Sequence, residues 1–312
     1  EVLLRGNVNG ASGELRLDAP PGWRVQPGAA AFRIAGLDQE TALSFAVIPP
    51  AGAGSGELRA VAKLDGREIS SGMRVIAHEG IPPQTIFPPS TAKLVRADAR
   101  TLARKIGYVM GAGDEVPRAL RQMGCEVTLL AAEDLARGDL SRFDAIVTGV
   151  RAYNVRPDLA ANQQRMLEYV QQGGTLVVQY LTTDRSSSVK GFGPYPIQLG
   201  SSRVTVEEAP VAFLDPNHPL LTVPNKIGEA DFQGWIQERG LNFASQWDPR
   251  YEPLFESHDP NEAPLRGGTL YARYGKGAYI FTTYSWFRQL PAGVPGAFRI
   301  FANFLSAGRS PR

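Results

Sequence analysis

Hydrophobic positions in residues 1–78 occur in short runs separated by turn residues, with no helical periodicity between them. The runs lie at 15–17, 32–34, 43–48, 58–64 and 73–76. The pair Asp65-Gly66, directly after LRAVAKL, is typical of a tight β-hairpin. Short strands at this spacing predict a small all-β sandwich over residues 1–78.

Residues 79–100 have little periodic pattern and contain the pairs Pro82-Pro83 and Pro88-Pro89. Proline cannot donate a hydrogen bond to a β-ladder, and it holds the preceding residue in an extended conformation. We therefore expect a semi-rigid Pro-rich linker here.

The pattern changes after residue 101. Near-continuous apolar runs, typical of buried strands, lie at 106–110, 127–130, 145–149 and 175–180. Helical patterns follow Asp114, with Pro117 in the first turn, and cover about 159–172 with Gly173 as the stop. Strands of this kind alternating with helices predict an α/β fold over residues 101–308, with a parallel sheet covered by helices on both faces.

Regularity decreases after Tyr180. We expect short strands at 204–206 and 211–214, a helix at 230–237, an antiparallel pair at 268–274 and 278–283, and a last helix at 295–305. That helix would present Phe298, Phe301, Phe304 and Leu305 to the sheet.

Composition limits the function classes. Lys and Arg number 33 and Asp and Glu 31, a net charge of +2, so we expect neither a nucleic-acid partner nor a membrane-surface role. The sequence contains no run of about 18 apolar residues, so we expect no membrane-spanning helix. The single cysteine, Cys125, excludes an intrachain disulfide. Because the chain opens in a strand-like segment without an initiator Met, we expect it to be a piece of a longer protein.

Long stretches of the second part resemble a known family. They are IGYVMGAGDEVPRALRQMG, RFDAIVTGVRAY, GGTLVVQY, DFQGWIQERGLNFASQWDPRY and QLPAGVPGAFRIFANFLS. Residues 106–306 resemble the glutamine-amidotransferase-like region found C-terminal to PIG-L/LmbE-type deacetylase domains in some bacterial proteins. The order of elements is similar to the ThuA-like, flavodoxin-like class I amidotransferase folds. Residues 1–78, with PPGWRVQP and the later FRI, resemble the Ig-like sandwich that accompanies glycosidases and these deacetylases.

The resemblance implies a parent protein that is a metal-dependent N-deacetylase acting in carbohydrate-linked chemistry, in a periplasmic or secreted setting. It also implies an upstream deacetylase domain as a partner. The metal-binding AHPDDE-type motif of that domain does not occur in this sequence. We therefore do not assign the deacetylase activity to these residues.

A class I amidotransferase needs a Cys nucleophile on a sharp strand-to-helix elbow and a His-x-Glu pair that activates it. We expect the elbow at the end of the fourth strand, around Gln179, Tyr180 and Leu181, where no small-x-Cys-x-small pattern occurs. Cys125 starts the second strand, at the opposite end of the sheet, and His258 has no accompanying nucleophile. We predict no catalytic residues of this class.

Other chemical motifs are weak. The serines at 186–188 lie on a polar loop without elbow glycines. Gly111-Ala112-Gly113 resembles a dinucleotide fingerprint, but Val116 replaces its third glycine. His78, His218 and His258 do not pair at metal-ligand spacing. We expect no metal and no cofactor.

Open α/β sheets bind ligands at the carboxyl ends of their strands. The candidate ligand-binding residues there are Asp114, Arg151, Tyr153, Tyr180, Trp235, Arg239, Trp286 and Arg288. Aromatic faces with Arg donors suit sugars or carboxylates. The opposing interpretation places Trp235 and Trp286 in the core and pairs the arginines with Glu238 or Asp231.

Three functions follow from these interpretations. The first is a non-catalytic accessory region that serves docking or ligand binding. The second is a sugar-binding or small-molecule-binding domain, with a glycan as the typical ligand. The third is a hydrolase or amidotransferase with an atypical nucleophile, which requires a Ser, Cys or Asp within hydrogen-bond reach of a base.

Overall fold

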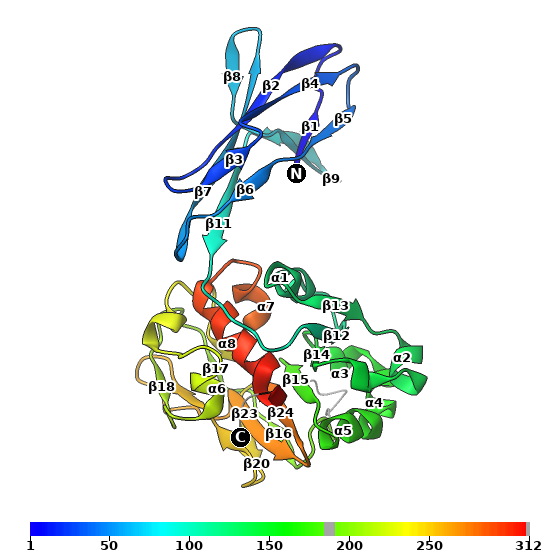
Figure 1. Cartoon of the computed structure of the whole chain (residues 1–312), viewed down its shortest axis with the longest axis vertical. Helices are drawn as coiled ribbons and strands as arrows, with labels where there is room; N and C mark the ends of the chain where they lie inside the picture. The colour runs from blue at the N-terminus through cyan, green and yellow to red at the C-terminus, as the bar shows by residue number, and fades with distance from the viewer. Residues whose placement is uncertain (184–190, 310–312) are drawn as a thin grey trace. The chain divides into compact units, whose positions relative to one another are not determined.

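The computed structural model describes residues 1–183 and 191–309, and the chain divides into two compact units, residues 1–96 and 97–312 (Figure 1). Within the described part, no helix is both long and apolar enough to cross a membrane.

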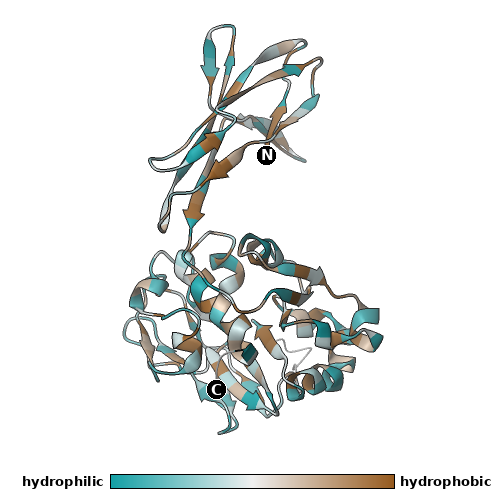
Figure 2. Cartoon of the chain, viewed as in Figure 1, coloured by the Kyte–Doolittle hydropathy of each residue, from teal (hydrophilic) through white to brown (hydrophobic). Residues whose placement is uncertain are grey.

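The first unit consists of strands. They are β1 (Val2–Arg5), β2 (Ala11–Asp18), β3 (Arg24–Gln26), β4 (Ala29–Ile34), β5 (Glu40–Leu43), β6 (Ala46–Ile48), β7 (Gly54–Leu64), β8 (Arg67–Ile69), β9 (Arg74–His78), β10 (Ile81–Ile86) and β11 (Thr91–Arg96). Its main sheet has the order β11-β7-β2-β4, with β8 paired to β7, and the remaining strands form the pairs β1–β5, β3–β6 and β9–β10. Figure 2 shows hydrophobic positions along these strands and hydrophilic positions at the tip of β8.

A small hydrophobic cluster forms the core of this unit. It contains the buried side chains of Leu15, Phe32, Ile34 and Ala62. The expected hairpin at Asp65-Gly66 joins β7 to β8, and both residues have positive φ angles, 47° and 78°. Asp and Gly tolerate this left-handed backbone better than other residues, which explains the strength of the sequence signal.

The linker prediction for residues 79–100 is wrong over most of its length. β10 pairs with β9, and β11 pairs along its whole length with β7. Pro82 and Pro83 fall where the β9–β10 register shifts, so their missing N–H groups interrupt no regular ladder. The boundary between the units lies at Arg96, within the predicted linker.

The second unit mixes helices with strands. Its helices are α1 (Val116–Gln122), α2 (Ala132–Arg137), α3 (Ala152–Val155), α4 (Pro157–Ala161), α5 (Gln163–Gln171), α6 (Pro219–Thr222), α7 (Trp286–Gln289) and α8 (Pro295–Ser306), with short 3-10 turns η1 (Leu140–Arg142), η2 (Glu229–Phe232) and η3 (Ala307–Arg309). The strands are β12 (Lys105–Val109), β13 (Glu126–Leu129), β14 (Ala145–Thr148), β15 (Thr175–Gln179), β16 (Ile197–Leu199), β17 (Arg203–Val204), β18 (Val211–Phe213), β19 (Gly240–Leu241), β20 (Ala244–Trp247), β21 (Glu252–Pro253), β22 (Phe255–Ser257), β23 (Thr269–Tyr274) and β24 (Gly277–Thr282).

A 7-stranded mixed sheet lies at the centre of this unit, with the order β13-β12-β14-β15-β24-β23-β21. The strands from β13 to β24 in this order run parallel. β23 is antiparallel to β24, and β21 is antiparallel to β23. Successive side chains alternate between two hydrophobic clusters, one shared with α1 and α8 and the other with α2, α4 and α5. The sheet is therefore covered on both faces, as the strand pattern predicted, but it is not purely parallel.

Two predicted helices are shorter than expected. The helix at 159–172 is interrupted at Asn162, whose side-chain amide donates to the Asp158 carbonyl and ends α4. The helix predicted at 230–237 is only η2, because Gly234 adopts a left-handed backbone with φ 67°.

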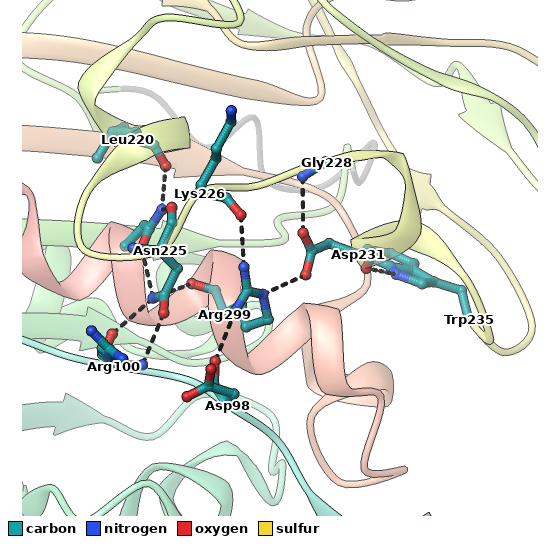
Figure 3. Close-up of polar contacts among 10 residues, drawn as sticks. Asp98, Arg100, Leu220, Asn225, Lys226, Gly228, Asp231, Trp235 and Arg299 are labelled. Atoms are coloured by element: carbon teal, nitrogen blue, oxygen red, sulfur yellow. Dashed lines mark hydrogen bonds and ion pairs between the residues drawn. The ribbon is translucent and has the colours of Figure 1, made fainter. Parts of the chain in front are cut away.

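The last helix, α8, is predicted well and is buried along most of its length. A polar network fastens it to the neighbouring loops (Figure 3). Arg299 donates to the Asp231 carboxylate at 2.7 Å and to the carbonyls of Asp98 and Lys226 at 2.8 and 2.6 Å. Asn225 and Asn303 also bond each other and the surrounding backbone. This network holds the start of the second unit against its final helix.

Candidate functional site

The loops that follow β12, β14, β15 and β24 leave the same edge of the sheet, because these strands run parallel. They contain most of the residues predicted to bind a ligand. The structure assigns these side chains to different roles.

Asp114 joins two of these loops. Its carboxylate accepts from the Tyr108 hydroxyl at 2.6 Å and from the backbone N–H groups of Val116 and Val150, each at 3.0 Å. A Cβ on Gly149 would meet Asp114 Oδ2 at 2.7 Å and the Tyr108 hydroxyl at 2.9 Å, so a larger residue here would displace these two groups. Asp114 therefore positions the backbone that precedes Arg151.

Arg151 occupies a sharp strand-to-helix turn after β14. Its backbone is left-handed, with φ 57° and ψ 23°, and it is the N-cap residue of α3. Its N–H donates to the Tyr180 carbonyl at 2.8 Å. Its side-chain Nε is buried and has no hydrogen-bond partner among the described residues.

The structure has no sharp turn around Gln179, Tyr180 and Leu181, where the sequence also lacks the small-x-Cys-x-small pattern. None of these residues has a positive φ, and no helix begins within residues 180–183, the described residues that directly follow β15. The left-handed residue lies one strand earlier, and an arginine occupies it. A guanidinium has five N–H donors and no acceptor, so it is suited to anion binding and not to nucleophilic attack.

Tyr180 lies next to Arg151. Its ring packs on Phe287, with ring centroids 5.7 Å apart, and the side chain is half-buried. Burial raises the pKa of its hydroxyl, the Arg151 and Arg288 charges oppose this rise, and the Glu238 charge adds to it. The phenol thus stays protonated near neutral pH and can donate a hydrogen bond beside two arginines.

Arg288 is paired with Glu238, as the opposing interpretation proposed. Its Nε lies 2.8 Å from Glu238 Oε1, and the Ser285 hydroxyl donates to the same oxygen at 2.8 Å. This hydrogen bond places a serine within reach of a carboxylate base, as a hydrolase with an atypical nucleophile would require. Ser285, however, is only 1% exposed, so a substrate has no access to its hydroxyl in this conformation.

Tyr153 and Trp286 are core residues. The Tyr153 hydroxyl donates to Gln163 Oε1 at 2.5 Å, and the Trp286 indole donates to Thr282 Oγ1 at 2.7 Å. Both side chains are buried, and the polar group of each ring has a hydrogen-bond partner within the protein.

Trp235 and Arg239 lie beside the loop that follows β24. The Trp235 ring packs on Trp286 with centroids 5.1 Å apart, and the Arg239 carbonyl accepts from the Ser285 N–H at 2.9 Å. Trp235 and Arg239 line a cavity of about 470 Å³ with Phe232 and a glutamate rim. Arg239 pairs with neither Glu238 nor Asp231. It donates instead to the carbonyls of Ala209 and Phe232, at 2.9 and 2.6 Å.

A larger cavity of about 940 Å³ is lined by residues 182–183, 191–199 and 246–248. None of the predicted ligand-binding residues lines it. The serines at 186–188, considered as alternative nucleophiles, lie outside the described residues. Cys125 is buried, and burial raises the pKa of its thiol to about 11, as expected of a small hydrophobic residue and not of a reactive thiolate.

Sequence reasoning did not identify Tyr108, Ser285 and Phe287 as parts of this region. Tyr108 has the pattern of a core strand residue, and its hydroxyl interaction with Asp114 gives no local signal. Ser285 and Phe287 flank Trp286 directly after the last parallel strand, so the strand-end rule that selected Trp286 and Arg288 would also have found them.

No protein-family model matches this chain, and no curated protein matches it. Solved structures give weak similarities. A β-galactosidase from Rahnella sp. R3 has a TM-score of 0.40 at 16% identity, over 69% of this chain and 32% of that one. An α-L-fucosidase isoenzyme 2 from Paenibacillus thiaminolyticus has a TM-score of 0.41 at 13% identity, over 67% and 33%. The cytoplasmic protein STM1381 from Salmonella typhimurium LT2 has a TM-score of 0.40 at 16% identity, over 75% and 95%. The chain thus spans 32% and 33% of the length of the two glycosidases, and similarities at this level assign no activity to it.

Proposed function

We propose that this chain is a non-catalytic accessory region whose α/β unit binds a carboxylate- or hydroxyl-bearing ligand, such as a sugar acid, at the ends of β14 and β15. The observation that carries the proposal is the buried, unpartnered Nε of Arg151 at the left-handed turn. Leaving a buried donor unpaired costs about 1–3 kcal/mol. Because Nε is buried, a ligand oxygen would reach it after a local rearrangement of this side chain, and the new hydrogen bond would recover the cost.

The surroundings of Arg151 support the same ligand class. The protonated Tyr180 hydroxyl offers a second donor, and the Phe287 ring, on which Tyr180 packs, adds an aromatic surface. Aromatic faces next to fixed donors are typical of sites that bind hydroxylated rings.

We also propose a specific fold family for the second unit. The order β13-β12-β14-β15-β24 has the 2-1-3-4-5 form of flavodoxin-like sheets, which supports a class I amidotransferase-like domain without its catalytic cysteine. On this basis we also propose the relation to the region downstream of PIG-L/LmbE-type deacetylases, a periplasmic or secreted setting, and an upstream deacetylase domain as partner.

The first unit would serve docking in this proposal, as an Ig-like module. Its β9–β10 hairpin has exposed apolar side chains at Val75, Ile76, Ile81 and Ile86, followed by Phe87. Contiguous exposed apolar side chains are typical of interaction surfaces.

The test is a thermal-shift titration of the intact chain with glucuronate, N-acetylglucosamine and glutamine. A bound ligand raises the melting temperature by mass action, by an amount equivalent to about 2.7 kcal/mol at a hundredfold excess over Kd. We expect a shift in the wild type and in the control Arg137→Ala, which changes an exposed arginine on α2, and none in Arg151→Ala. A shift that persists in Arg151→Ala would exclude the proposed site.

A hydrolase with Ser285 as nucleophile is the alternative, and the Ser285–Glu238 hydrogen bond is the observation that favours it. It predicts labelling by a fluorophosphonate ester in the wild type and none in Ser285→Ala. Equal absence of labelling in both proteins, with a labelled serine hydrolase as positive control, would remove this alternative.

A further inference from the structure

The cavity of about 470 Å³ beside η2 contains a buried arginine without a counter-ion. Arg239 is 4% exposed and lines this cavity. No carboxylate of the described residues lies within ion-pair distance of it, and Nε and Nη1 donate only to the carbonyls of Ala209 and Phe232. Its Nη2 makes no hydrogen bond to the described part of the chain. A buried charge that is paired only by carbonyl dipoles favours an incoming anion.

Aromatic rings hold this guanidinium in place. Phe232 and Trp235 stack with centroids 5.4 Å apart, and the Arg239 guanidinium carbon lies 5.3 Å from the Trp235 ring centre. The Trp235 indole is itself anchored, because it donates to the Asp231 carbonyl (Figure 3). The cation is therefore fixed before any ligand arrives, which lowers the ordering cost of binding.

The rim of the cavity has the opposite charge. Glu207, Glu208 and Glu229 line it, and none of them forms a salt bridge among the described residues. A polyanion would be repelled by this rim, and a simple cation would be repelled by Arg239. The arrangement suits a ligand with one negative end and a positive remainder.

We propose that this cavity binds a basic α-amino acid, with its carboxylate on Arg239 and its ammonium or guanidinium groups among Glu207, Glu208 and Glu229. A volume of about 470 Å³ lies in the usual range of small-molecule pockets. The site is separate from the one proposed at Arg151. Glu238 directs its carboxylate to Ser285 and Arg288, whereas the adjacent Arg239 bonds toward Ala209 and Phe232.

The test is isothermal titration of the whole chain with L-lysine, compared with two analogues that each lack one charged group. Norleucine lacks the side-chain ammonium, and cadaverine lacks the carboxylate. We expect L-lysine to bind at least about tenfold more tightly than either, equivalent to about 1.4 kcal/mol. Equal affinities of L-lysine and cadaverine would overturn the role of Arg239, and no binding of L-lysine up to about 10 mM would overturn the proposal.

Rim variants test the other half of the site without changing the core. Glu208→Gln combined with Glu229→Gln should remove most of the preference for L-lysine over norleucine, whereas Glu133→Gln on α2 should leave it intact. Unchanged preference for L-lysine in the double variant would contradict the proposal.

Discussion

Arg151 combines a strained backbone with a functional side chain, and substitution can separate the two. A non-glycine residue in the left-handed region costs about 1 kcal/mol or more. Arg151→Gly removes the strain and the guanidinium, whereas Arg151→Ala removes only the guanidinium. We expect the glycine variant to have a free energy of unfolding about 1 kcal/mol higher than the alanine variant in urea titrations. Both variants should fail to bind the ligand, and equal stabilities would show that the turn is not strained.

His218 should make stability depend on pH below neutrality. Burial lowers the pKa of its imidazole, and the charges of Glu252 and Asp215 oppose this only in part. The unfolded state, with a pKa near 6.5, therefore binds a proton before the folded state does. Above about pH 6.5, His218 is neutral in both states and does not affect stability. As the pH falls below this value, only the unfolded state gains the proton, so stability decreases until the pH passes the lower pKa of the folded state.

The comparison that checks this is urea unfolding of the wild type and His218→Asn at about pH 7.5 and 5.5. The histidine Nδ1 accepts from the Leu220 N–H at the start of α6, and asparagine is also a good N-cap. We expect a smaller loss of stability on acidification in the variant. The same loss in both proteins would assign the effect to other groups.

At the scale of elements, α8 depends on a close approach that glycine alone allows. A Cβ on Gly296 would meet the Asp231 carbonyl oxygen at 1.9 Å. Helix propensity favours alanine by about 1 kcal/mol, but a forced shift in a packed interface costs about 1–3 kcal/mol. We therefore expect Gly296→Ala to lower the free energy of unfolding, with Ala297→Gly as the control for propensity. A more stable Gly296→Ala protein in the same denaturant titration would contradict the steric argument.

The elements that sequence predicts well are those whose signal is local. The central strands at 106–110 and 145–149 are continuous apolar runs, and the Asp65-Gly66 turn requires a backbone that few residues adopt. The Pro-rich segment forms strands because proline is tolerated on an edge strand at a register shift, and that shift depends on the partner strand, which the local sequence does not reveal. The direction in which a loop side chain points is also not encoded in a local sequence pattern. Glu238 and Arg239 are adjacent in the sequence, but the Glu238 carboxylate accepts from Arg288, whereas Arg239 donates to the Phe232 carbonyl, and the strand-end rule cannot separate these directions.

At the scale of the whole molecule, each unit has a hydrophobic core of its own. The cluster of the first unit contains only residues of that unit, and the two clusters of the second unit contain only residues of the second unit. The first core is small, because the buried hydrophobic side chains of this unit are those of Leu15, Leu17, Phe32, Ile34, Val61 and Ala62. A core of this size gives a modest stability that a single truncation would strongly reduce.

Leu15→Ala should therefore change one unfolding transition and leave the other. Truncating a buried leucine costs about 2–5 kcal/mol, most of the stability that so small a unit can have. We expect scanning calorimetry of the wild type to show two transitions, with the earlier one shifted or lost in the variant. Because the strand-end site and the Arg239 cavity lie within residues 97–309, ligand-induced shifts should persist in the later transition of Leu15→Ala. A single transition that moves as a whole would mean that the units unfold together, and binding at either site would then depend on the first core as well.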